Sequence, residues 1–98
     1  MSGKVEVTFE VTNMDVMQQT LEKLGHKFTK NGEVLTIARS YYNIEIAKNK
    51  ISCDSMNTGE VERIKVEYQR DYQLYERAVR GEIYEMTETN NEIVIMVQ

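Results

Sequence analysis

Residues 4–11 alternate strictly between polar and apolar side chains. This period of two predicts a β-strand with one buried and one solvated face. Between Met14 and Leu24 the apolar residues recur every three or four positions, which predicts an amphipathic helix. Asn13 suits the N-cap of this helix, and Gly25 suits the left-handed residue that ends it. A strand that leads directly into a helix favours a fold that mixes both kinds of element.

A β-hairpin is predicted around Asn31-Gly32, because this dipeptide is typical of a two-residue turn. Its strands would be residues 26–30 and 33–39. The expected register pairs Lys30 with Glu33, Phe28 with Leu35 and His26 with Ile37. Phe28, Leu35 and Ile37 would then share the core face of the hairpin.

Further β segments are predicted at residues 41–47 and 51–54, where isoleucines and Cys53 alternate with polar residues. A last hairpin is predicted over residues 82–89 and 92–98, with its turn at Asn90-Asn91. Its expected register pairs Glu88 with Ile93, Met86 with Ile95 and Tyr84 with Val97.

A second, longer helix is predicted from Asn57 or Thr58 to about Arg80, ending before Gly81. Asn57 and Glu60 have the spacing of a capping box, so one of the first two residues should cap the helix. The predicted buried stripe consists of Val61, Ile64, Tyr68, Tyr72, Tyr75 and Val79.

The two halves of the chain follow the same order of strand, helix, glycine and hairpin. The first hairpin runs from Gly25 to Ile37 and the second from Gly81 to Val97, with the strand at 41–47 between the halves. We therefore predict an α+β domain built as a β-α-β-β pseudo-repeat. It would have a mostly antiparallel sheet of about seven strands with both helices on one face. A ferredoxin-like arrangement with the middle strands as insertions is the alternative fold.

The length of 98 residues favours a single domain over residues 1–98. A net charge of −4 argues against general affinity for nucleic acid, because such binding depends on Lys and Arg neutralising phosphates. No apolar run is long enough for a signal-peptide core or a membrane span. The single cysteine, Cys53, cannot form an intrachain disulfide. These features predict a cytoplasmic protein with no membrane partner.

Four segments carry a family resemblance: the opening strand at 5–12, Thr-Leu-Glu-Lys-Leu-Gly at 20–25, Tyr42-Asn43-Ile44, and a closing pattern of Tyr72, Ala78, Gly81 and Glu92-Ile93-Val94-Ile95. On these the chain resembles Domain of Unknown Function 1257, the chloroplast hypothetical reading-frame 35 family, which also has bacterial and phage members. The chain is shorter than the usual plastid form and lacks the tryptophan often found before the second helix. The resemblance implies a compact accessory protein and assigns no activity to any residue.

No residue pattern indicates catalysis or metal binding. His26 is the only histidine, so a metal site would have to recruit carboxylates around it. Cys53 could act as a nucleophile only with His26 as its base, and a small buried side chain is the favoured role. The isolated glycines form no phosphate-binding loop. We predict that the protein is not an enzyme and uses no cofactor or metal.

Arg63, Arg70 and Arg77 recur every seven residues and lie nearly on one line of the second helix. Glu60 and Glu67 lie three or four positions from these arginines, and Asp71 directly follows Arg70. Ion pairs on a solvated helix face are therefore favoured over a phosphate-binding ridge. The line still supports the alternative function, a nucleotide or nucleic-acid accessory protein in which these arginines contact an anion or a partner.

The outer face of the last hairpin would group Ile83, Val94 and Met96, and no helix is left to cover them. Such a patch is typical of an interface. The sequence therefore favours a small non-enzymatic binding module that acts through protein–protein contacts, as a bacterial or phage accessory or inhibitor protein. A homodimer is the expected assembly, because two-fold symmetry is the commonest closed arrangement.

Overall fold

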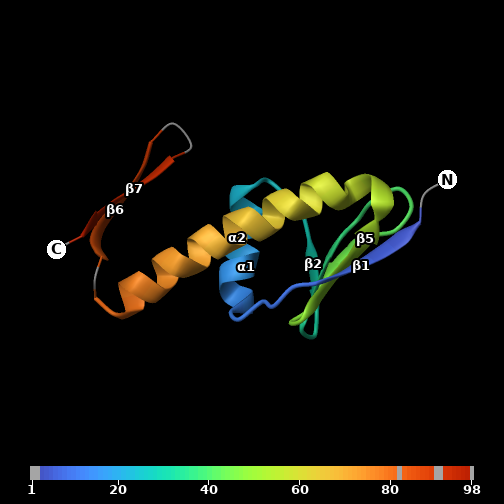
Figure 1. Ribbon diagram of the computed structural model, residues 1–98, viewed down its shortest axis with the longest axis horizontal. Coiled ribbons are helices and arrows are strands. Elements are labelled where there is room, and N and C mark those ends of the chain that lie inside the picture. The colour runs from blue at the N-terminus through green and yellow to red at the C-terminus, as the bar shows by residue number, and fades with distance from the viewer. Residues whose placement is uncertain (1–2, 82, 90–91, 98) are drawn as a thin grey trace.

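The computed structural model describes residues 3–81, 83–89 and 92–97, the last two ranges by their backbone (Figure 1). In chain order the elements are β1 (Lys4–Thr8), α1 (Met14–Lys23), β2 (Thr29–Asn31), β3 (Val34–Ile37), β4 (Ile44–Ile46), β5 (Lys50–Asp54), the 3₁₀ turn η1 (Ser55–Asn57), α2 (Thr58–Val79), β6 (Ile83–Thr89) and β7 (Glu92–Val97). The predicted α+β class is confirmed, because strands and both predicted helices are present.

Five strands form one antiparallel sheet in the order β1-β5-β4-β3-β2. One row across the sheet consists of Val7, Ile51, Ile46 and Leu35. The next row consists of Glu6, Ser52, Glu45 and Thr36. Because successive side chains of a strand point to opposite faces, one face of the sheet is apolar and the other polar. The ferredoxin-like alternative is not confirmed, because the strand that follows the second helix would have to join the same sheet, and among the described residues β6 pairs only with β7.

The hydrophobic core lies between the apolar face of the sheet and the two helices (Figure 1). Met17 and Leu21 of α1 and Ile64 of α2 have no exposed surface. They share one cluster with the buried isoleucines of β3, β4 and β5. The period-two and period-3.6 patterns of the sequence therefore mark the residues that meet in this core.

α1 begins at the predicted residue. The side-chain oxygen of Asn13 accepts hydrogen bonds from the backbone N–H groups of Asp15 and Val16, at 3.0 and 3.2 Å. These bonds satisfy two donors that have no partner inside the helix, so the predicted N-cap is confirmed. Gly25 follows the helix with φ of 81°, the left-handed conformation that was expected there.

α2 begins differently from the prediction. Asn57 occupies the N-cap position, but its side chain makes no capping hydrogen bond. The capping carboxylate belongs to Asp54, which accepts a hydrogen bond from Met56 N–H at 3.1 Å and so caps η1 instead. The predicted capping box is wrong, because the Glu60 carboxylate is bound by the guanidinium of Arg39.

The first hairpin turns one residue later than predicted. Its pairs are Thr29–Thr36, Lys30–Leu35 and Asn31–Val34. The loop is therefore Gly32-Glu33, with Gly32 at φ of 63° in the first central position, where such turns require a positive φ. The register differs by two residues from the expected one, and a shift of two keeps each side chain on its face. The predicted core face is confirmed, since Leu35 and Ile37 are buried and Phe28 packs against the core.

The predicted sheet of about seven strands is not confirmed. Within the described residues β6 and β7 pair only with each other, as a separate two-stranded sheet. Their register pairs Glu88 with Ile93 and Met86 with Ile95, as predicted. A bulge then pairs Ile83, rather than Tyr84, with Val97.

The length of α2 explains why the second hairpin does not join the sheet. α2 has 22 residues and at 1.5 Å per residue is about 33 Å long, whereas a five-residue strand spans about 17 Å. The helix therefore extends past the sheet and carries the chain away from both sheet edges (Figure 1). The β-α-β-β pseudo-repeat is not confirmed, because the first hairpin joins the five-stranded sheet and the second does not.

Candidate functional site

One face of α2 carries the inner stripe, which consists of Val61, Ile64, Tyr68, Tyr72, Tyr75 and Val79. Its first three members expose at most 2% of their surface, as predicted. Tyr75 and Val79 are 44% and 68% exposed, so the prediction of a fully buried stripe is wrong at its C-terminal end. The reason is that the last turns of α2 lie beyond the sheet and α1 (Figure 1).

Aromatic rings connect the buried and exposed parts of the inner stripe. Phe9, Tyr68, Tyr72 and Tyr75 follow one another with ring centroids 5.8, 5.9 and 6.2 Å apart. The Tyr68 hydroxyl accepts a hydrogen bond from the Asn13 N–H at 3.0 Å, which satisfies a polar atom at the core boundary. Burial and the nearby Glu76 carboxylate raise the pKa of Tyr72, so its phenol stays neutral. These four rings form an aromatic ladder, which continues the apolar, uncharged surface of the core to the exposed end of α2.

Two acidic residues of α2, Glu67 and Asp71, face α1. Lys23 of α1 lies 3.0 Å from the Glu67 carboxylate and 2.8 Å from that of Asp71. Asp71 also accepts a hydrogen bond from the Thr20 hydroxyl at 2.7 Å. Burial lowers the pKa of Lys23, but its hydrogen bonds to Asp71 and Glu67 raise the pKa by more, so the net shift is upward. These contacts hold the two helices together through charged groups at the edge of the core.

A second charged cluster lies at the N-terminal end of α2. Arg39, from the β3–β4 loop, binds both oxygens of Glu60, with its Nε donating at 3.1 Å. The His26 ring nitrogen Nδ1 lies 3.4 Å from Glu60. The hydrogen bonds to Glu60 raise the pKa of Arg39, which keeps the guanidinium charged. His26 therefore belongs to an arginine–carboxylate cluster, and the described residues contain no group of three metal-ligating side chains.

The arginine line, which consists of Arg63, Arg70 and Arg77, is exposed to solvent. Within the part of the chain that the structure describes, none of the three makes an ion pair or a hydrogen bond with another side chain. The ion pairs expected from the sequence do not form there, because the nearby acids bind Lys23 and Arg39 instead. The outer face of α2 therefore carries three guanidinium groups without a carboxylate partner.

Cys53 is fully buried in the core, as its favoured role requires. Burial raises the pKa of its thiol, and the Asp54 and Glu60 carboxylates raise it further. Since the thiolate is the reactive form, this environment suppresses nucleophilic chemistry. The neighbouring Asp54 is also buried, and its Oδ2 has no hydrogen-bond partner among the described residues.

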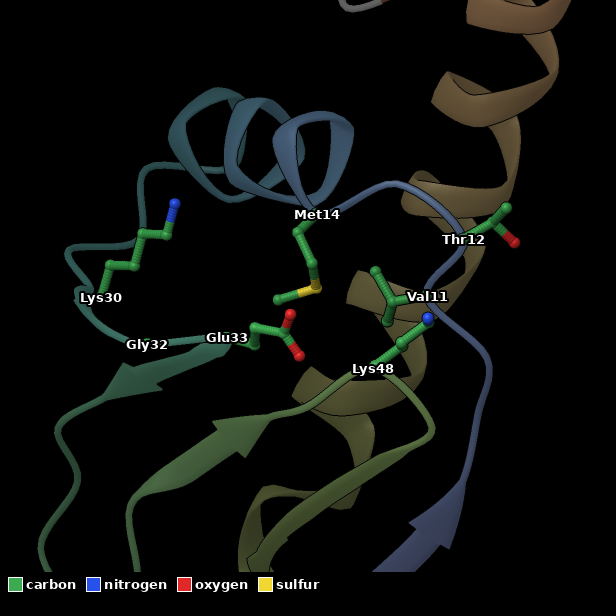
Figure 2. A pocket seen from close by; sticks show the side chains of 7 residues that line it. All are labelled: Val11, Thr12, Met14, Lys30, Gly32, Glu33 and Lys48. Atoms are coloured by element: carbon green, nitrogen blue, oxygen red, sulfur yellow. The ribbon is translucent and has the colours of Figure 1, made fainter.

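A pocket of about 330 Å³ lies at the end of the sheet opposite to η1 (Figure 2). Its lining consists of Val11, Thr12, Met14, Lys30, Gly32, Glu33 and Lys48. Lys30, Lys48 and Glu33 are all exposed, and Figure 2 shows the Glu33 carboxylate between Met14 and Lys48. The rim of the pocket thus carries both positive and negative side chains, and this combination does not indicate a particular reaction. No sequence pattern predicts this pocket, because its lining comes from three separate loops, from β2 and from the start of α1.

The predicted interface of Ile83, Val94 and Met96 falls on side chains outside the described ones. The backbone of β6 and β7 places Val94 opposite Thr87 and Met96 opposite Glu85, while Ile83 lies beyond the bulge. The interface therefore stays a prediction.

No family model, curated protein or solved structure matches this chain. Among the described residues, neither α1 nor α2 combines the length and the apolar composition that a membrane crossing requires. The case for a function therefore depends on the surfaces of the molecule itself, above all on the two faces of α2.

Proposed function

We propose that the protein is a small non-enzymatic binding module that acts through protein–protein contacts. The docking surface is the uncovered end of the inner stripe, Tyr72, Tyr75 and Val79. The observation that supports this assignment is that Tyr75 and Val79 continue the line of the buried Val61, Ile64 and Tyr68 and are nevertheless largely exposed. A contiguous apolar surface at the end of a projecting helix is typical of an interface.

The occupant that fits this surface is a second copy of the chain. Tyr72 lies three residues before Tyr75, and Val79 lies four residues after it. Two antiparallel copies of α2 that cross near Tyr75 therefore bring Tyr72 of one copy beside Val79 of the other. The same surface serves both partners, as a two-fold interface requires. Ile83, Val94 and Met96 follow α2 in the chain, and the proposal includes them as the second part of this interface.

A role as a bacterial or phage accessory or inhibitor protein belongs to the same proposal. An accessory protein acts by occupying the surface of another molecule, which requires an exposed apolar contact rather than a catalytic group. The aromatic ladder supports such a contact, since tyrosines supply large contact areas with few rotatable bonds.

Sedimentation equilibrium tests the proposal. We expect the average mass of the wild-type protein to rise toward that of a dimer as its concentration increases. The double variant Tyr75→Ser/Val79→Ser should associate at least about 10-fold more weakly, because two partly buried side chains are lost from the contact. The matched control is Val66→Ser, which removes a 59% exposed valine from the outer face of α2 and should associate like wild type.

Two results contradict the proposal. A wild-type protein that stays monomeric up to millimolar concentration has no such interface. A Val66→Ser variant that loses association as strongly as the double variant would show that general surface hydrophobicity, and not the inner stripe, drives the contact. Circular dichroism spectra of all variants must show that the helices remain intact.

A further inference from the structure

The net charge of −4 hides an uneven distribution of charge on α2. A spacing of seven residues at 1.5 Å per residue separates successive members of the arginine line by about 10.5 Å, so the line is about 21 Å long. Seven residues make nearly two helical turns, which keeps the three side chains on one side of the helix. That side is opposite to the inner stripe, because Val66 on the outer face is 59% exposed while Ile64 and Tyr68 are buried.

The acids that would neutralise the arginine line are held elsewhere. Glu67 and Asp71 bind Lys23 on the α1 side of α2. Glu60 binds Arg39 at the start of the helix. Glu62 is an exposed acid of α2 near the arginine line. Its carboxylate lies 3.0 Å from the ammonium of Lys65. The fold thus separates charges that the sequence interleaves, and it leaves the outer face of α2 positive.

We propose that the arginine line binds the sugar–phosphate backbone of double-stranded nucleic acid, without reading its sequence. Guanidinium groups are suited to phosphate oxygens, which they can bind through two hydrogen bonds at once. The phosphates of a duplex form a linear array of negative charges. A row about 21 Å long spans about six base pairs of such a duplex. This surface is separate from the protein-docking stripe of the proposed function, since the two lie on opposite faces of α2.

The outer face favours a duplex over the other anionic ligands. A single strand is bound largely by bases that stack on aromatic side chains. The tyrosines of α2 all belong to the inner stripe, so the outer face has none to offer. A free nucleotide is held in a concave site, whereas the arginine line is a row of exposed side chains along one helix. The contacts that remain are to phosphates, which a duplex presents at the highest linear density.

Fluorescence anisotropy with a labelled 20-base-pair DNA of arbitrary sequence tests the proposal across a series of salt concentrations. Neutralising three phosphates of a duplex should give a slope of about −2.7 in a plot of log K against log salt concentration. The variant Arg70→Gln should reduce the magnitude of this slope by about 0.9. The triple variant Arg63→Gln/Arg70→Gln/Arg77→Gln should lose measurable binding.

The matched control is Lys27→Gln/Lys30→Gln/Lys48→Gln. These three lysines are exposed, lie outside α2, and change the net charge by the same amount. We expect this control to keep most of the affinity and the slope. Thermal unfolding of each variant should occur near the wild-type midpoint, because none of the six side chains is buried.

Three results would overturn the proposal. The first is a lysine control that loses as much affinity as the arginine variant, which would show an effect of net charge alone. The second is tighter binding to a single strand than to the duplex. The third is tighter binding to polyglutamate than to DNA, which would identify an acidic protein as the partner of the line. Since the Tyr75→Ser/Val79→Ser variant keeps all three arginines, its DNA binding should equal that of wild type even if the proposed self-association fails.

Discussion

Cys53 shows how surroundings determine what a side chain can do. It pairs across the sheet with Val5 and has no exposed surface. Burial raises the pKa of its thiol, and two nearby carboxylates add to the shift. The folded state therefore favours the protonated thiol. The contribution of the buried Cys53 thiol to stability is present below the ordinary thiol pKa of 9.0. It is lost as the pH rises through the higher pKa that this thiol has in the folded state.

Alkylation measures this protection. At pH 8 we expect iodoacetamide to modify Cys53 in the native protein at least about 100-fold more slowly than in the urea-unfolded protein, because reagent access requires the core to open. Mass spectrometry of samples quenched over time gives both rates. Rapid modification of the native protein would show that β5 is accessible and that Cys53 is not a core residue.

At the scale of elements, Asn13 and Asn57 take the same position before the two helices but do different things. Asn13 bonds two backbone N–H groups of α1 through its side chain. Asn57 follows η1, where Asp54 already supplies the capping oxygen. The asparagine side chain therefore stabilises the start of α1 but makes no capping bond at the start of α2. The reason is that the preceding 3₁₀ turn changes the backbone that leads into α2.

This difference predicts unequal effects of two identical substitutions. Asn13→Ala should lower the free energy of unfolding by about 1 kcal/mol, since the helix loses its side-chain cap. Its backbone N–H keeps the bond to the Tyr68 hydroxyl, so that contact does not contribute to the difference. Asn57→Ala should lower the free energy by less than about 0.5 kcal/mol. Urea unfolding of the two variants measures both values, and equal losses would contradict the assignment of the caps.

At the scale of the whole molecule, the length of α2 sets the architecture. Its first half covers the sheet, and its second half extends beyond it with the hairpin of β6 and β7 (Figure 1). All the core residues of the described part lie between Val5 and Tyr72. An isolated two-stranded hairpin has little stability of its own, so the pairing of β6 with β7 should gain stability from the proposed self-association.

Truncation after Arg80 tests this division of the molecule. We expect the shortened protein to unfold cooperatively, with a thermal midpoint within a few degrees of the full chain, because the described core precedes the cut. Circular dichroism during heating gives the midpoint and the steepness of the transition. Loss of a cooperative transition would show that the hairpin contributes to the core.

Much of the fold follows from local patterns. The alternation in residues 4–11 predicts β1, and the apolar spacing after Asn13 predicts α1 with its cap. Even the misplaced turn of the first hairpin left its core face correct, because a register shift of two residues conserves the face of every side chain. The pairing of the second hairpin near its turn was predictable for the same reason, since a two-residue loop fixes which residues face each other.

The sequence by itself determined the class of the fold, the two helices and the side of each element that faces the core. Only the tertiary structure decided which cations Glu60, Glu67 and Asp71 of α2 bind. Glu67 can reach Arg63 or Arg70 along its own helix, but Lys23 of α1 lies at the partly buried helix interface, where an ion pair is less screened by water. Because these acids bind other cations, Arg70 stays exposed without a carboxylate partner. Because α2 extends beyond the sheet, Tyr75 stays exposed on the opposite face of the same helix. Periodicity shows which side chains share a face, whereas distances between elements determine which of them remain without a partner.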